Sequence, residues 1–241
     1  MTKENPIRDQ SDPLRPMMMD VSFPDLGDDF PFGRDELEQS IASIEDRKKL
    51  DECLPGVTLG ENTVVLLDNN NIYRATKNIG LRMDYLKLKR IFEERCNLRS
   101  MVIFSALDRD DPQSLDWAKW VRKRGFGLVT KDLKRYRNRK GVIEAKGNLD
   151  VELTLAAMTL SDQIDHVIIG SRDGDFVPLV RELKKGHHRK VSILGSSGPT
   201  ESDDDAPTGM SSDLIEEADN FYDLVSLKPF LIYYRPKSTK S

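Results

Sequence analysis

The chain has 241 residues, of which 37 are lysine or arginine and 41 are aspartate or glutamate, so its formal net charge is −4. This length exceeds that of one average domain and is short for two, so we expect one domain with additional terminal segments. The slight excess of acids excludes a global attraction to nucleic acid, and any nucleic-acid site must be a local basic patch. The two cysteines have no CxxC spacing, which argues against a disulfide framework or a zinc site.

The first 60 residues differ from the rest, because prolines stand too close together there for a helix or a central strand. We expect residues 1–60 to form a flexible arm with one weakly amphipathic accessory helix over 35–50. A run of three methionines followed by phenylalanines among acids either docks a protein partner or packs onto the protein's own core. The polar, acid-containing start is unlike a secretory signal, and no run of about eighteen apolar residues occurs, so we expect a cytoplasmic protein without a membrane segment.

After residue 60, short apolar runs alternate with longer charged segments of helical period, which is typical of strands and helices around a mostly parallel sheet. Five β-branched or aromatic runs predict buried strands over 64–67, 100–104, 126–129, 167–169 and 191–194. Helices are predicted over 82–96, 112–124, 149–159, 176–185 and 212–227. The expected fold is a doubly wound α/β sandwich of about five strands over 61–228, with a mobile loop at 195–209 and a tail from 229 to 241.

Aspartates stand where such a sheet binds ligands, beyond the carboxyl ends of its strands. Asp68 directly follows the first expected strand and opens the run DNNN, which either lines a site or makes a turn. Asp173 and Asp175 follow the fourth strand and precede a helix, so capping of that helix is the alternative role, most strongly for Asp175 and less for both acids together. Two carboxylates held close together cost stability unless a cation lies between them. The two acidic clusters therefore suggest a shared metal ion.

Asp150 opens the expected helix over 149–159, where helix capping is again the alternative role. Glu152 lies on a different side of that helix and is the less certain acid. Oxygen ligands without histidine or cysteine favour Mg²⁺ or Mn²⁺, and such an ion keeps open positions for phosphate oxygens. The aspartates therefore predict metal-assisted phosphodiester hydrolysis.

A basic segment between the third expected strand and Asp150 is the expected nucleic-acid contact. The predicted substrate-binding residues in and after this segment are Lys134, Arg135, Tyr136, Arg137, Arg139, Lys140 and Lys146. Basic side chains bind phosphates regardless of sequence, and Tyr136 is placed to stack on an unpaired base. A solvated loop is the alternative interpretation.

Four phrases of the sequence resemble the successive signatures of NYN domains, and among these they are most similar to the LabA-like branch. The phrases are VVLLDNNNIY, KGNLDVELTLAAM, IIGSRDGDFVPLVRELKKGHHRKVSILG and SSDLIEEADNFYDL. They extend over about residues 62–227 in the expected order. NYN domains belong to the PIN-like superfamily, so the resemblance implies a PIN-like fold and a metal-dependent nuclease.

The resemblance also implies particular site residues. The family's metal-binding acids, its asparagine and its serine fall on Asp68, Asn71, Asp150, Ser171, Asp173 and Asp175. The chain departs from the family pattern in three places. Arg172 replaces the usual glycine, one residue is inserted before Asp150, and a later acid of that helix is Ala156. Arg172 either contacts substrate phosphate or crowds the pocket.

Two functions remain open from the sequence. In the first, four aspartates hold Mg²⁺ or Mn²⁺ for the hydrolysis of single-stranded or structured RNA, while Asn71 orients a ligand or the scissile phosphate. In the second, the same pocket binds RNA with little or no catalysis, and the amino-terminal arm recruits a protein partner. A homodimer is compatible with both.

Overall fold

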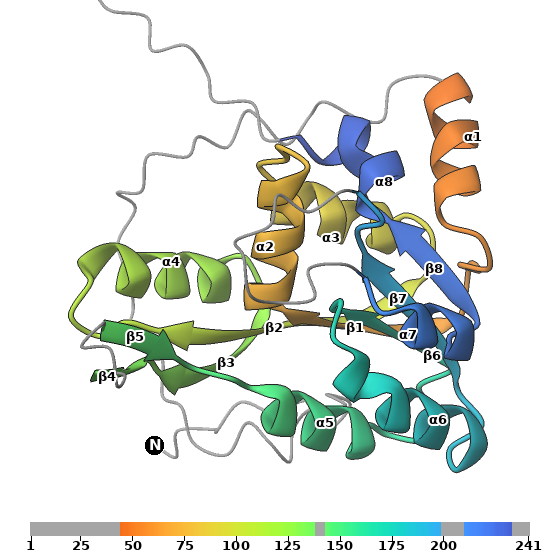
Figure 1. Cartoon of the computed structure of the whole chain (residues 1–241). Helices are drawn as coiled ribbons and strands as arrows, with labels where there is room; N and C mark the ends of the chain where they lie inside the picture. The colour runs from red at the N-terminus through yellow and green to blue at the C-terminus, as the bar shows by residue number, and fades with distance from the viewer. Residues whose placement is uncertain (1–43, 138–142, 199–209, 233–241) are drawn as a thin grey trace, which may run out of the picture.

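The computed structural model describes residues 44–137, 143–198 and 210–232. Its centre is a six-stranded parallel sheet with the strand order β3-β2-β1-β6-β7-β8 (Figure 1). The strands are β1 (Asn62–Asp68), β2 (Asn97–Leu107), β3 (Gly127–Asp132), β6 (His166–Gly170), β7 (Lys190–Gly195) and β8 (Asn220–Asp223). The chain reverses its direction of travel across the sheet between β1 and β6, as in a doubly wound fold. All five predicted strands are present, and the predicted α/β class is confirmed.

Helices cover both faces of the sheet (Figure 1). One face carries α1 (Ile44–Cys53), α2 (Asn69–Asn78), α3 (Tyr85–Glu93), α4 (Pro112–Lys123) and α8 (Leu224–Leu231). The opposite face carries α5 (Asp150–Met158), α6 (Val177–Lys185) and α7 (Ser212–Glu217). In the described residues, no helix is both long and apolar enough to cross a membrane.

The two faces bury separate hydrophobic cores. Along β1, Val65 and Leu67 belong to the first core and Val64 and Leu66 to the second, because successive side chains of a strand point to opposite faces. All four are fully buried, which explains why this strand is a continuous apolar run in the sequence.

The predicted helix over 212–227 is wrong. This segment forms α7, then the sixth strand β8, and then α8. Tyr222 of β8 is buried in the first core, whereas its neighbour Phe221 packs against the second. That alternation is the period of a strand, but NFYD is only four residues long and the apolar residues around it have helical spacing. α8 continues to Leu231, beyond the predicted domain end at 228.

Two further elements differ from the sequence prediction. The segment after Asp68, expected as a turn or a site loop, forms α2. The basic segment contains a two-stranded antiparallel sheet of β4 (Lys134–Arg137) and β5 (Ile143–Lys146) rather than a loop alone. Of the accessory helix predicted over 35–50, the part before residue 44 lies outside the described residues. The described part continues as α1 to Cys53 and packs Leu50 into the first core.

The division into arm, domain and tail stays a prediction. The methionines and phenylalanines proposed to dock a partner lie outside the described residues, as do most of the expected loop at 195–209 and the end of the tail.

Candidate metal centre

The predicted aspartates lie at the carboxyl edge of the sheet, around the point where the chain direction reverses. β1 ends at Asp68, and the neighbouring β6 ends at Gly170, shortly before Asp173. Leu67 of β1 and Gly170 of β6 are paired in register, so the two strands deliver their following residues side by side. This is where doubly wound sheets bind their ligands.

Three of the four aspartates form a close group. Asp150, Asp173 and Asp175 each offer a carboxylate oxygen, and these oxygens lie within 4.8 Å of one another. Asp150 and Asp173 are half-buried and Asp175 is exposed, so the group opens towards solvent. A set of carboxylate oxygens with an open side fits a hard divalent cation that retains water ligands.

Asp68 lies beside this group rather than within it. Its Oδ1 accepts hydrogen bonds from the backbone N–H groups of Asn70 (3.1 Å) and Asn71 (3.2 Å), which caps α2. The Asn71 amide donates to Asp68 Oδ2 at 2.5 Å. The charge of Asp68 nevertheless contributes to raising the pKa of Asp150. Of the four predicted metal-binding acids, Asp150, Asp173 and Asp175 form the close group, and Asp68 is the one outside it.

The helix-capping role that was the alternative for Asp175 falls on Asp173 instead. Asp173 caps the short 3₁₀ turn over Gly174–Phe176, because its Oδ1 accepts the backbone N–H of Asp175 at 3.0 Å. The backbone N–H of Asp173 in turn donates to Oγ of the buried Ser171 at 3.2 Å. Local hydrogen bonding therefore fixes the backbone that presents Asp173 and Asp175.

Asp150 is not the cap of its helix either. The N-cap residue of α5 is Leu149, and Asp150 occupies the first helical position. The side chain of Asn148 makes two hydrogen bonds to Asp150. Its Nδ2 donates to Asp150 Oδ2 at 2.6 Å, and its Oδ1 accepts from the Asp150 backbone N–H at 2.9 Å. Asn148, which sequence reasoning did not single out, thus orients the carboxylate towards Asp173 and Asp175.

The electrostatics of the site favour a bound cation. Burial raises the pKa of Asp150, the hydrogen bond from Asn148 opposes this, and the charges of Asp68, Asp173 and Asp175 raise it further. Burial also raises the pKa of Asp68, with hydrogen bonds from Asn71 and Asn70 opposing it and Asp173 adding to it. A cation among these carboxylates would relieve the repulsion between them. The residues present therefore fit a divalent metal ion.

Close packing brings the segment before α5 to the site. A Cβ added to Gly147 would lie 2.3 Å from Cβ of Ala106 on β2, so only glycine lets the chain pass this strand. The Asn70 amide on α2 donates to the carbonyl of Gly147 at 3.2 Å. This hydrogen bond connects the first turn of α2 to the segment that precedes Asp150.

A polar chain that sequence reasoning missed supports the start of α2. The Tyr85 hydroxyl on α3 donates to Asn69 Oδ1 at 2.5 Å, and the Asn69 amide donates to Oγ of Ser105 on β2 at 3.1 Å. The only sequence signal for this chain is that Asn69 directly follows Asp68.

The basic segment is described only in part. The backbone of Lys134, Arg135, Tyr136 and Arg137 forms β4, and Lys146 pairs with Lys134 across the antiparallel ribbon. Arg139 and Lys140 lie outside the described residues. β5 leads directly towards α5 (Figure 1), so the ribbon adjoins the chain that carries Asp150. Its nucleic-acid contacts stay a prediction.

Glu152 is held away from a ligand role by an ion pair. Lys131 on β3 lies 2.7 Å from Glu152 Oε1, and this hydrogen bond lowers the pKa of Glu152.

Arg172, which replaces the usual glycine of the family, precedes Asp173 and is half-buried. Burial and the nearby charge of Arg74 lower the pKa of Arg172, against the opposing effect of Asp173.

Comparisons with known proteins agree with this architecture. The family model described as NYN domain matches residues 62–227. The chain is 21% identical over 170 residues to the low amplitude and bright protein LabA of Synechococcus elongatus, covering 69% of this chain and 86% of that protein. A crystal structure of a protein of unknown function from Vibrio parahaemolyticus superimposes with a TM-score of 0.55 at 27% identity, covering 68% of this chain and 93% of that one. Because the family match extends from β1 into α8, the chain belongs to the NYN domain family, a family of PIN-like nucleases.

Proposed function

We propose that the chain is a divalent-metal-dependent ribonuclease whose acidic site is formed by Asp68, Asp150, Asp173 and Asp175. The observation that supports this most directly is the grouping of three carboxylates within 4.8 Å at the ligand-binding edge of an NYN domain. When bound, Mg²⁺ or Mn²⁺ would neutralise phosphate charge and lower the pKa of a water that attacks the phosphodiester.

The chain's own residues have distinct roles in this proposal. Asp150, Asp173 and Asp175 would hold the ion, and Asp68 adds negative charge beside it. Asn71 fixes the Asp68 carboxylate by its hydrogen bond, and the buried Ser171 fixes the backbone of Asp173. The hydrogen bonds of Asn71 and Ser171 hold the acidic side chains and their backbone in place. Groups around the ligands of a metal site commonly have this orienting role.

The test is cleavage by the purified full chain. Labelled single-stranded and hairpin RNAs are incubated in Mg²⁺, Mn²⁺ or EDTA, and products are separated on denaturing gels. We expect cleavage only with metal, and a loss on the order of a hundredfold in Asp150→Asn and Asp173→Asn. Glu52→Gln, which neutralises an exposed acid on the distant α1, is the matched control and should cleave normally. Cleavage that survives in both site variants would overturn the proposal.

A second candidate function rests on Arg172. A half-buried guanidinium next to Asp173 brings positive charge to a site that would otherwise attract a metal more strongly. In that case the pocket binds RNA without efficient hydrolysis. RNA binding without metal-dependent cleavage in the same assay would favour this regulatory function.

A further inference from the structure

The middle of α2 carries two exposed side chains, Tyr73 and Arg74, that belong to neither hydrophobic core. Tyr73 is 62% exposed, more than any other aromatic residue whose side-chain burial the structure describes. Its neighbour Arg74 is also exposed. An exposed tyrosine beside an exposed arginine on a rigid helix is the combination that binds single strands, through base stacking and phosphate contact.

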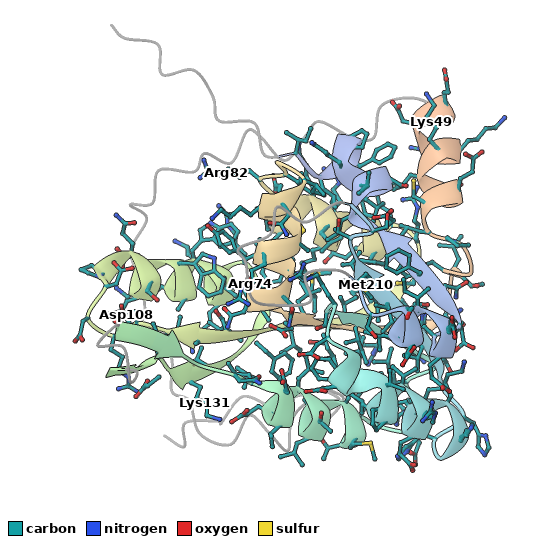
Figure 2. The ribbon with its side chains drawn as sticks, in the orientation of Figure 1. Lys49, Arg74, Arg82, Asp108, Lys131 and Met210 are labelled. Carbon is teal, nitrogen blue, oxygen red and sulfur yellow. The ribbon has the colours of Figure 1, made fainter. Side chains whose placement is uncertain are left out.

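The position of these side chains relative to the acidic site follows from α2. Tyr73 is three residues and Arg74 is four residues after Asn70. Residues at these spacings are neighbours on one side of a helix. The Asn70 amide bonds the carbonyl of Gly147, three residues before Asp150. Tyr73 and Arg74 therefore lie on the side of α2 that contains Asn70, the residue that contacts the segment before Asp150. Figure 2 shows Arg74 beside α2.

Arg74 supplies the positive charge of this part of α2, and its guanidinium group is exposed to solvent. Phosphate is an anion that guanidinium groups bind with two parallel hydrogen bonds. Arg74 is therefore placed to contact the backbone of a nucleic acid strand that reaches the acidic site.

We propose that Tyr73 and Arg74 form a binding surface for single-stranded RNA beside the acidic site. Arg74 contacts a backbone phosphate, and Tyr73 stacks on an adjacent unpaired base. The assignment of the ligand as RNA rests on the proposed function. The inference adds a choice of substrate, because a base inside a duplex is already stacked and does not present its face to Tyr73.

The test measures binding rather than cleavage. Fluorescence anisotropy with the full chain compares a labelled single-stranded RNA of about ten nucleotides with a duplex of the same length, in EDTA so that no hydrolysis occurs. We expect tighter binding of the single strand. Tyr73→Ala should weaken single-strand binding about tenfold, whereas Tyr73→Phe, which retains a stacking ring, should bind almost as the unchanged chain does.

The phosphate contact of Arg74 is tested by the dependence of RNA affinity on salt concentration. Arg74→Ala should reduce the slope of log affinity against log salt by about 0.7, the share of one released phosphate contact on a single strand, while Arg74→Lys keeps the slope. Two remote controls should change neither affinity nor slope. Leu59→Ala removes a side chain that is 78% exposed before β1, and Lys185→Ala removes an exposed cation at the last residue of α6, towards the opposite edge of the sheet.

The outcomes separate this inference from the ribonuclease proposal. Unchanged single-strand binding in both Tyr73→Ala and Arg74→Ala, or equal losses on the duplex, would overturn the binding surface even if the chain cleaves RNA. Losses confined to the single strand would support the surface even if no cleavage occurs with any metal.

Discussion

The charge state of Asp150 depends on the protein around it. Burial and three neighbouring acids raise its pKa, with Asn148 opposing them. The folded protein therefore binds this proton more tightly than the unfolded chain does. The free energy of unfolding then falls as the pH rises from about 4, the ordinary range of aspartate, through the folded-state pKa. Without metal, the charged form of Asp150 is a destabilising group at neutral pH.

An uncharged side chain at position 150 should therefore stabilise the fold when no metal is present. In EDTA, Asp150→Asn should unfold at a higher temperature than the unchanged chain at pH 7, and the difference should shrink as the pH approaches 4. Thermal unfolding followed by circular dichroism across this pH range measures it. Glu52→Gln provides the comparison, because that exposed acid on α1 lies far from the site. A difference that stays constant with pH would contradict the assignment.

Tyr85 illustrates a residue that sequence reasoning had no means to select. It lies sixteen positions from Asn69, and only the packing of α3 against the sheet brings its hydroxyl to Asn69 Oδ1. We predict that Tyr85→Phe lowers the free energy of unfolding by about 1 to 2 kcal/mol, because Asn69 Oδ1 loses its donor. Urea denaturation measures the change. Tyr73→Phe removes the same hydroxyl from an exposed ring, and a similar loss there would refute this explanation.

At the scale of elements, strands buried on both faces could be predicted from the sequence, whereas α2 and β8 could not, because they depend on a capping hydrogen bond and on pairing with a distant strand. Strands buried on both faces are continuous apolar runs, so β1, β6 and β7 were recognised. α2 begins with three asparagines, which have low helix propensity, and forms because Asp68 caps it and Ile72 packs into the first core. The four-residue strand β8 depends on pairing with β7, a contact distant in sequence.

The connection between β5 and α5 sets the position of Asp150 and depends on Gly147. A methyl group there would lie 2.3 Å from Cβ of Ala106. We predict that Gly147→Ala displaces this segment, lowers the unfolding temperature and reduces any metal-dependent cleavage, as contacts this short force a backbone shift. Ala106→Gly removes the opposing methyl group at a cost of about 0.5 to 1 kcal/mol, so the double variant should recover much of both losses.

Recovery in the double variant is what distinguishes a clash from a general effect of the substitution. Melting curves and cleavage rates of the two single variants and the double variant form a complete cycle. If Ala106→Gly adds its own cost without restoring Gly147→Ala, the close approach of these two residues does not explain the need for glycine.

At the scale of the whole molecule, the acidic site joins segments that are far apart in the chain. Asp68 ends β1, Asp150 begins α5, and Asp173 and Asp175 follow β6. Order along the chain and strand-end position predicted that these acids share an edge. They did not predict that Asp175 belongs to the close group while Asp68 caps a helix beside it, because this depends on the turn that Asp173 itself caps.

Metal binding should consequently stabilise the entire fold, because the unfolded chain cannot hold these carboxylates together. A ligand that binds only the folded state stabilises it by about 2.7 kcal/mol at a concentration one hundred times its dissociation constant. We predict that Mg²⁺ or Mn²⁺ raises the unfolding temperature of the unchanged chain and of Glu52→Gln. Asp150→Asn and Asp173→Asn should lose most of this rise. An equal rise in all four proteins would indicate a cation bound elsewhere, and the grouped aspartates would then be an acidic surface rather than a metal centre.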